Sequence, residues 1–553
     1  MIIKNINTSK KITLFLFLIS LLIGVLTFKD YGIAGDEDFH RAMGFYWLDY
    51  ILNFTPFQNL KDEVGIKLSM LQYIDFQVIT NSYGVIFDVP AALLEVLFKI
   101  DDPKNYFYFK HFLTFIIFFL GSVFFYKLLI NRFSDDLIAM IGTLFFFISP
   151  RIYGNSFYNP KDIIFLSLIS IAIYYCFKLF DKISYKNFLI FALFSALATS
   201  QRIFGIFLPL SFLGFYLLSV LSKKEDISYF PGILFFCISF FVFLISFWPY
   251  LWSDPIGNFL TAYNYFSHHT HLLTLKMLFN GKYVATSSVP YEYIVTWITI
   301  TTPTLYLLLF IFGYFFIFKK FFLNFINVQE KSKDYDLWNN SREKKDLFIV
   351  LNFTVIIFYL ILVNASMFTG WRHLYFTNIF IIYIATFTFH KINLRLKKEM
   401  SRKLFFALTF FYLFFISYKM FNLHPYQNIY FNSVFTTLVK NIHKKFEIDY
   451  WGLTGKKALE NILSLEKNEN SVSVAVASYL PLDISKKLLN KNDRKRIKIV
   501  GQDYLNADYI YTNFVSEVDK NYNDKYKIPT NFSKINTFIS NNVVVYEVYK
   551  KNE

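Results

Sequence analysis

The sequence predicts an all-α polytopic membrane bundle of about eleven transmembrane helices, followed by a small C-terminal soluble α/β domain. Three observations predict this fold class. The 553 residues are 55% hydrophobic and include 72 Phe, more than a soluble core of this size could enclose. The apolar residues are grouped in runs that approach the ~20 residues needed to cross a bilayer. The charged fraction, 17%, is below the ~25% typical of soluble domains, so lipid is the expected solvent.

The spanning runs are apolar and nearly free of charge in their middles. They fall near 12–29, 107–127, 137–150, 162–180, 187–200, 203–221, 230–249, 294–318, 347–363, 373–390 and 403–421. The shorter runs can borrow flanking aromatic or snorkelling residues to reach both interfaces. The first run follows Lys4, Lys10 and Lys11 and has no small-residue cleavage site, so we expect an uncleaved first helix rather than a signal peptide.

Lys and Arg are concentrated in alternate loops, among them 319–346 and 391–403. Because basic residues collect in cytoplasmic loops, this asymmetry predicts a cytoplasmic N-terminus. With an odd number of spans, the C-terminal domain lies on the outward side. The formal net charge of +16 then reflects these loops, and nucleic-acid binding is not expected.

Two long outward loops, 30–106 and 250–293, belong to a membrane domain of residues 1–421. The first contains an amphipathic segment, Tyr83 to Ile100, which we expect to lie on the membrane surface. Residues 422–553 form the predicted soluble domain. Its expected elements are a helix at 454–466 and strands at 471–478, 496–501, 507–513 and 543–549.

Three consecutive acids, Asp36, Glu37 and Asp38, directly follow the first span. Gly35 is expected to end the first helix and to hold Asp36 at the membrane surface. His40 follows Asp36 by four residues, which places it on the same helical face and within reach of the Asp36 carboxylate. A carboxylate in this position could act as a general base toward a hydroxyl or amine, although a solvated surface charge is the plainer interpretation.

Four cations stand at outward helix ends, against the rule that basic residues collect inside. Arg202 falls between two adjacent spans, where a guanidinium is costly unless it is paired or bound to phosphate. Each cation alone could be a snorkelling charge, but their shared side predicts a site for an anionic lipid head group. The candidate residues are Arg151 and Lys161, which flank a short outward turn, Asp162, which opens the next helix, Arg202, Arg372 and His373.

Other features indicate little chemistry. His268-His269-Thr-His271 in the second outward loop could bind a metal, but short His clusters in loops are mostly polar surface. Cys176 and Cys237 lie inside apolar runs and are expected to be buried thiols. The chain has no Gly-rich phosphate loop, so no nucleotide cofactor is expected.

Two motifs resemble a known family. Asp36-Glu37-Asp38-Phe39-His40 is similar to the Asp-Glu-x-His-Phe stretch of protein O-mannosyltransferases, with His and Phe exchanged. Arg151 followed by Asn159-Pro160-Lys161-Asp162 looks like that family's outward turn, where an Arg precedes an acid that opens the next helix. Roughly residues 10–420 resemble the GT-C membrane glycosyltransferases, nearest to the bacterial family related to protein O-mannosyltransferases and the lipid A aminoarabinose transferase. Asp449-Tyr450-Trp451-Gly452-Leu453 also resembles uncharacterised bacterial members and says little about chemistry.

The resemblance implies a polyprenyl-phosphate sugar donor and inverting transfer to a protein, glycan or lipid acceptor at the outer face of a bacterial inner membrane. Asp36 would be the base and Glu37 would assist it. The donor phosphate would be held by Arg151, Lys161, Arg202 and Arg372. Some relatives place a divalent metal near the acidic loop. A transporter or flippase of lipid-linked saccharide is the alternative, although it would place charges in mid-span. A structural subunit whose tail binds a partner is a third possibility.

Overall fold

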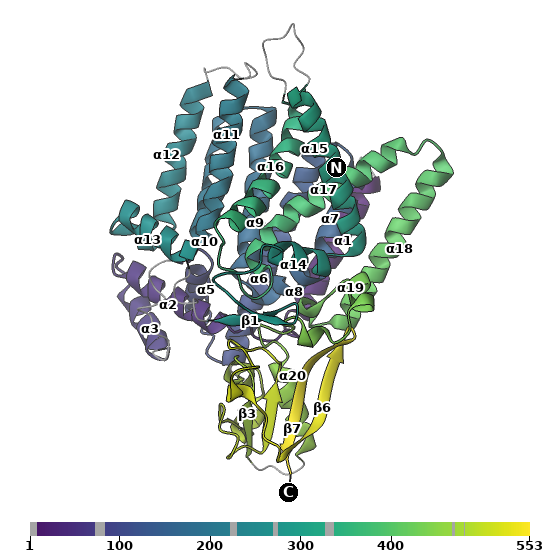
Figure 1. Ribbon diagram of the computed structural model, residues 1–553. Helices are drawn as coiled ribbons and strands as arrows, with labels where there is room; N and C mark the ends of the chain where they lie inside the picture. Colours follow the sequence, from purple (N-terminus) through teal and green to yellow (C-terminus); the bar gives the residue numbers. More distant parts are fainter. Residues whose placement is uncertain are drawn as a thin grey trace.

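The computed structural model describes residues 8–71, 83–221, 229–268, 275–326, 337–466, 471–480 and 482–552. A bundle of long helices forms one end of the molecule, and the C-terminal sheet forms the other (Figure 1). The end of the bundle that faces this sheet is called the outward end, following the orientation predicted from Lys and Arg. The chain is a multi-pass membrane protein with the predicted fold class.

Among the described residues, seven helices are long and apolar enough to cross a membrane. They are α1 (Thr8–Thr27), α6 (Pro103–Phe133), α9 (Asp162–Asp181), η1 (Ile203–Ile206) with α11 (Phe207–Leu221), α15 (Thr304–Ile326), α16 (Ser341–Leu362) and α18 (Glu399–Leu423). The other apolar helices are α7 (Asp136–Phe147), α10 (Tyr185–Gln201), α12 (Phe230–Ser246) and α17 (Asn378–Arg395), which follows η5 (Arg372–Thr377). Each of the eleven predicted runs overlaps one or two helices.

Two runs differ from the prediction. The turn expected after the third run is instead a helix, α8 (Pro150–Tyr158), bent by 65° from α7. Pro150 occupies the first turn of α8, where its missing N–H has no cost and its fixed φ favours a helix. The run 294–318 is broken into α14 (Tyr293–Thr301) and α15 on either side of Pro303, since proline cannot donate the helical hydrogen bond.

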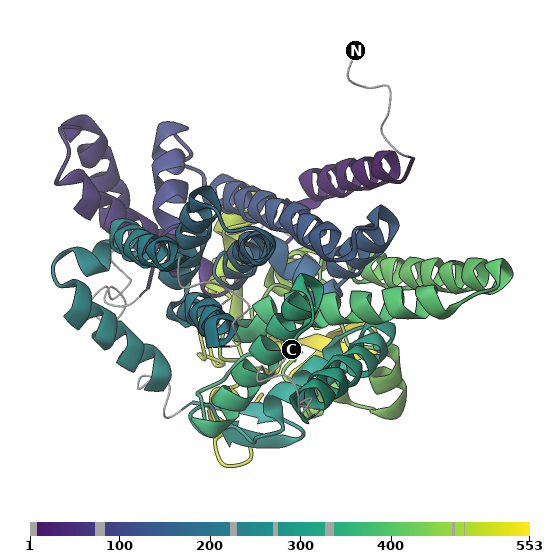
Figure 2. The same cartoon turned by 90° about the horizontal axis from the view of Figure 1, so that it is seen from above.

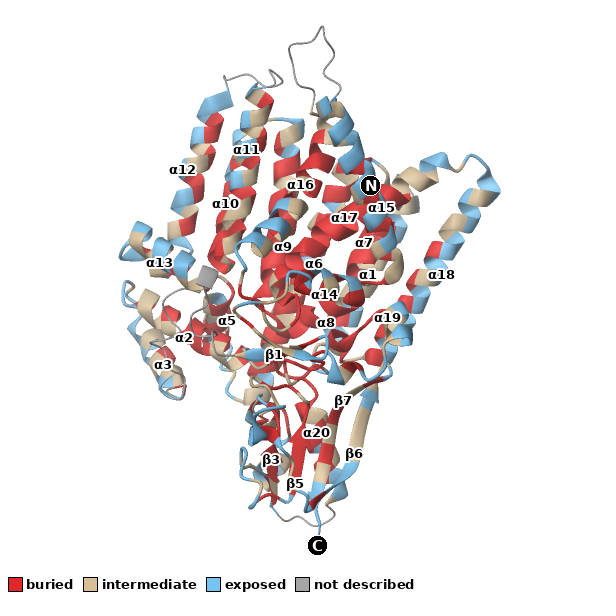
Figure 3. Cartoon of the chain, in the orientation of Figure 1, coloured by how far each residue is buried: buried red, intermediate tan, exposed pale blue. Residues whose placement is uncertain are grey.

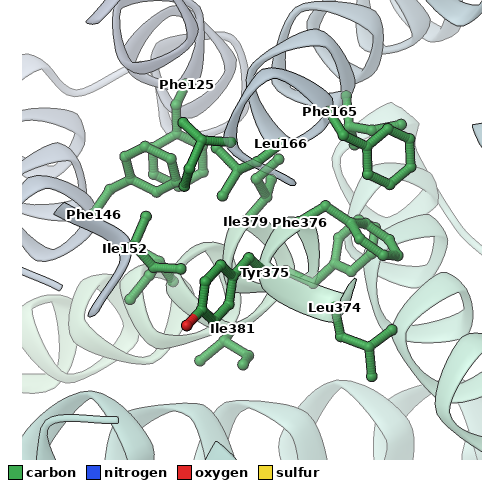
Figure 4. Close-up of a cluster of buried hydrophobic side chains, with 14 of the residues drawn as sticks. Phe125, Phe146, Ile152, Phe165, Leu166, Leu374, Tyr375, Phe376, Ile379 and Ile381 are labelled. Carbon is green, nitrogen blue, oxygen red and sulfur yellow. The ribbon is translucent and has the colours of Figure 1, made fainter. Parts of the chain in front are cut away.

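The centre of the bundle is packed with aromatic and β-branched side chains (Figure 4). Phe125 and Phe146 stack at 4.7 Å, and Phe165 contacts Phe376 at 4.9 Å. In lipid such contacts stabilise by close packing rather than by exclusion of water. Helices α6 and α9 come close at Gly121, where an added Cβ would lie 2.7 Å from Ser167.

Burial divides central helices from outer ones (Figure 3). Helix α9 is mostly buried, whereas α18 exposes most of its apolar residues. Viewed from above, α1 and α18 lie on one side of the bundle (Figure 2). The outward-loop helices lie on the opposite side in both views. They are α2 (Glu37–Leu52), α3 (Gln58–Ser69), α5 (Asp88–Leu97) and α13 (Pro255–His268), preceded by η3 (Pro249–Trp252). Helix α5 is the predicted amphipathic segment.

The C-terminal part contains a five-stranded mixed sheet of order β4-β3-β5-β7-β6. Its strands are β3 (Val472–Val476), β4 (Ile497–Ile499), β5 (Tyr509–Thr512), β6 (Phe532–Ser540) and β7 (Val543–Lys551). Strands β4, β3 and β5 are parallel, and β7 is antiparallel to both β5 and β6. The predicted helix is α20 (Gly455–Leu465), and four strands match the prediction. Edge strand β6 was not predicted, because only one of its nine residues is buried and its apolar alternation is weak.

A second unpredicted element is the hairpin of β1 (Lys276–Phe279) and β2 (Lys282–Ala285) in the second outward loop. Its turn is Asn280-Gly281, and both residues have positive φ. Asn-Gly between two strand-like runs is a strong hairpin signal that could have found it. Lys276 N donates to Glu517 O at 2.8 Å, which ties the hairpin to the C-terminal part.

Candidate functional site

The acidic loop lies against the C-terminal part of the chain. Helix α1 ends at Thr27, so Gly35 does not end it as predicted; the chain first crosses the outward face. Gly35 N donates to Trp451 O at 3.1 Å. Gly32 packs so closely that an added Cβ would lie 2.2 Å from Leu453 O. Contacts from a distant segment therefore fix the position of this loop.

Asp36 is the most accessible of the three acids, with 48% of its side chain exposed. Its Oδ2 accepts a hydrogen bond from Arg372 Nη1 at 3.0 Å. The Arg372 side chain is only 8% exposed, and its guanidinium lies 4.9 Å from the ring centre of Phe368 and 4.7 Å from that of Trp451. A buried cation thus holds a carboxylate that remains open to solvent.

The other two acids are engaged in structural contacts. Glu37 is buried, accepts from Ala34 N at 2.8 Å, and lies 3.0 Å from His111 Nε2. Asp38 forms an ion pair with Lys487 of the C-terminal part. Glu37 therefore fixes the loop before Asp36 and has little freedom to meet a substrate.

His40 does not contact the Asp36 carboxylate as predicted. Its backbone N–H donates to Asp36 O, but its imidazole Nδ1 lies 3.5 Å from Asp88 Oδ2. The reason is that α2 packs against α5, which begins at Asp88, so the buried face of α2 turns the ring toward that helix. His40 joins two outward helices instead of orienting the candidate base.

Arg202 and Asp162 form an ion pair at the start of α9. Arg202 is extended, with φ −144° and ψ 123°, and separates α10 from η1. Asp162 is 1% exposed and also accepts from Asn159 Nδ2 at 3.0 Å. The guanidinium predicted to need a partner thus has a buried carboxylate beside it.

Lys161 is buried next to this pair, and its Nζ donates to Gly84 O at 2.6 Å. Burial lowers the pKa of Lys161 to about 8, against the opposing effect of Asp88. A negative charge placed beside this ammonium would stabilise its protonated form, because that charge would compensate for the hydration lost on burial.

A cavity of about 1280 Å³ adjoins these cations. Its polar lining includes Lys161, Gln201, Arg202 and His373. Its remaining walls are mainly apolar and follow η1 and α11 from Ile203 to Leu218 and α16 from Leu351 to Val363. At 1.5 Å per residue, the α11 wall alone is roughly 20 Å long. Leu210 and Val355 line the cavity and are exposed at the bundle surface, so it is open toward lipid.

Tyr83 connects the cavity with the Asp36–Arg372 pair. It lines the cavity, and Lys161 Nζ lies 4.9 Å from its ring centre. Burial raises the pKa of Tyr83 to about 12; Asp36 adds to this rise, while Arg202 and Arg372 oppose it. The phenol is thus within electrostatic reach of Asp36, Arg202 and Arg372, and His373, the residue directly after Arg372, also lines the cavity.

Arg151 is not among the residues that line the cavity, whereas Lys161 is. It is on α8, 2% exposed, and its Nε donates to Tyr430 O at 2.9 Å. Its guanidinium lies over the rings of Trp297 and Phe431, at 5.2 and 4.9 Å. The short turn predicted between Arg151 and Lys161 is instead a helix, α8, and the clamp of these two cations around a phosphate stays a prediction.

The acidic loop does not fit a divalent metal. Its three carboxylates face three different partners, and no group of three His, Cys, Asp or Glu suited to a metal occurs in the part of the chain that the structure describes. Of the His cluster, His269 and His271 and the side chain of His268 lie outside the described residues.

Sequence reasoning missed three contributors. Gln201 adjoins Arg202 and could have been found from that neighbour, and Tyr83 begins the amphipathic segment. Trp451 belongs to a stretch that resembled other proteins but gave no sign that it contacts Arg372. Only folding brings it to the acidic loop.

No family model matches the chain, and no curated protein matches it. Among solved structures, it is similar to ArnT from Cupriavidus metallidurans, a GT-C lipid A aminoarabinose transferase crystallised with undecaprenyl phosphate. The two share 10% identity over 98% of each chain, with a TM-score of 0.46.

Proposed function

We propose that the chain is a membrane glycosyltransferase. It moves a sugar from a polyprenyl-phosphate-linked donor to an acceptor at the outer face of the cytoplasmic membrane, with inversion, and Asp36 is the general base. One observation carries the proposal: a long, lipid-open apolar cavity has Lys161, Arg202 and His373 in its lining, and His373 directly follows the Arg372 that holds the half-exposed Asp36 carboxylate.

The cavity fits the donor's two chemical parts. The apolar walls of α11 and α16 would take the isoprenoid chain, and Lys161 and Arg202 would take the phosphate. When the sugar is transferred, the lipid phosphate leaves as an anion. Cations fixed in a site of low dielectric stabilise the charge that develops on the leaving oxygen. Arg151 does not line the cavity and is left out of this assignment.

Asp36 would take the proton from an acceptor hydroxyl or amine. The freed lone pair attacks the anomeric carbon on the face opposite the phosphate. The new bond forms between the acceptor atom and that carbon, and the carbon–oxygen bond to phosphate breaks with its electrons on oxygen. A single displacement inverts the anomeric configuration. Arg372 orients the Asp36 carboxylate throughout.

The arrangement of charges favours an enzyme over a flippase. A flippase needs a polar path between leaflets. The candidate groups gather at the outward end of the helices instead. Near the other end of the helices, Arg132 Nε donates to Asp346 Oδ1 at 2.6 Å. The Tyr383 hydroxyl donates to the same oxygen at 2.8 Å. None of these three lines the cavity.

The test uses the purified full-length protein in nanodiscs with polyprenyl-phosphate-linked sugars and an extract of cell-envelope acceptors. Asp36→Asn should lower transfer by about 10²–10⁴-fold, the usual contribution of a general base. Asp62→Asn, on exposed helix α3, is the matched control and should transfer like the wild type. Full activity in Asp36→Asn would remove Asp36 from the mechanism, and the absence of transfer from every donor would reject the proposed function.

A further inference from the structure

The five residues Asp449–Leu453, here the Trp451 turn, form a rigid unit. Gly452 N donates to Asp449 O at 3.0 Å, and Gly452 has φ +72°, which favours glycine. The Asp449 side chain is fully buried and accepts from Leu453 N at 3.1 Å and from Thr454 N and Oγ1 at 2.8 and 2.7 Å. These bonds fix the turn from inside.

The turn is also attached to the C-terminal sheet. Asn513, directly after β5, donates from Nδ2 to Asp449 O at 2.9 Å. Helix α20 begins two residues after the turn. Displacement of the C-terminal domain would therefore displace the turn with it.

The Trp451 turn contacts both sides of the Asp36–Arg372 pair. Its backbone oxygen holds Gly35, the residue before Asp36, at 3.1 Å. Its indole lies 4.7 Å from the Arg372 guanidinium, whose planar face favours an aromatic ring. Tyr450 adds a hydroxyl contact of 3.2 Å with Tyr375 on η5, the helix that begins at Arg372.

We propose that Trp451 is a positioning residue, through which the C-terminal domain aligns the Asp36 carboxylate for proton abstraction. The inference rests on the proposed function. Trp451 acts through Arg372 and does not line the cavity. Its loss should therefore reduce turnover while donor binding is preserved, because small misplacements of a catalytic group reduce the rate strongly.

The kinetic test compares Trp451→Ala, Trp451→Phe and the control Trp252→Ala, whose side chain packs on Tyr50 and Phe54 in the outward loops. We expect kcat to fall about 10- to 100-fold in Trp451→Ala, with the Kd for polyprenyl phosphate within about twofold of wild type. Trp451→Phe keeps an aromatic face and should recover most of kcat. Unchanged kcat in Trp451→Ala, or an equal loss in kcat and donor affinity, would overturn the proposal.

A second readout needs no sugar. The labelling rate of Asp36 by a water-soluble carbodiimide and an amine, followed by mass spectrometry, reports how firmly Arg372 holds the carboxylate. Trp451→Ala should label several-fold faster than wild type, and Trp451→Phe and Trp252→Ala should label at the wild-type rate. Equal rates in Trp451→Ala and wild type would refute the positioning role even if transfer is observed. Faster labelling in a protein that transfers no sugar would keep the positioning contact and reject only the proposed function.

Discussion

Replacing Arg202 by alanine should affect stability and donor affinity for separate reasons. The change leaves Asp162, 1% exposed, without its cation. Breaking a buried ion pair costs about 3–5 kcal/mol, and the remaining bond from Asn159 places the expected loss near the lower figure. A charge-assisted hydrogen bond to the donor phosphate is worth about 1.5–3 kcal/mol, which is roughly a 10- to 150-fold weaker Kd.

The double variant Arg202→Ala with Asp162→Asn separates the two effects. It removes the uncompensated buried charge, so its unfolding free energy should return to within about 1 kcal/mol of wild type. Donor affinity should stay as weak as in the single variant, because no guanidinium faces the phosphate. Thermal unfolding and polyprenyl-phosphate binding, both in nanodiscs, measure the two quantities. If the double variant regains wild-type affinity, Arg202 serves only to neutralise Asp162, and the phosphate assignment fails.

Further predictions concern other parts of the site. The pKa of Lys161 is lowered to about 8, so its ammonium is present below that pH and lost above it. The affinity for the donor should therefore fall about tenfold between pH 8 and pH 9.5 in the wild type, and should not change with pH in Lys161→Arg. Gly84→Ala places a Cβ 1.6 Å from Ser200 O and should lower the unfolding free energy by at least about 1–3 kcal/mol. The control Gly65→Ala, whose Cβ would point into open space, should be neutral or slightly stabilising. Equal melting temperatures in the two variants would contradict the close contact at Gly84. Glu37→Gln removes the buried charge partner of the His111 imidazole and should lower the melting temperature. It should reduce kcat per folded molecule far less than Asp36→Asn does. A larger loss of kcat in Glu37→Gln than in Asp36→Asn would make Glu37 the base.

The helices of the bundle could be predicted because a spanning run is a property of composition along the chain. Bends could not be predicted from the same signal. Hydropathy does not reveal the 65° angle between α7 and α8 or the break at Pro303, because the residues on both sides of the bend and of the break are apolar. As a result, Arg151 and Lys161 stand near the two ends of helix α8 rather than at the two ends of a short turn.

The candidate site was predicted as a set of charges, but not as a set of pairs. Arg202 could be predicted because a guanidinium between two adjacent spans is costly without a partner. Asp36 could be predicted because it opens a run of three acids directly after a span. Their partners, Arg372 and Asp162, were also identified, yet nothing in the spacing linked them. Pairing depends on how helices distant in sequence pack, and the Trp451 turn is the clearest example. Its aromatic side chain has no periodic or charge signal that would place it on a guanidinium.

The central claim is that one cavity receives a polyprenyl phosphate with its phosphate at Lys161 and Arg202. A structure of the full-length protein in nanodiscs with bound polyprenyl phosphate tests it directly. The account predicts phosphate oxygens within hydrogen-bonding distance of both cations and the isoprenoid chain between α11 and α16. A phosphate bound instead near Arg132, or a lipid chain outside this cavity, would contradict it.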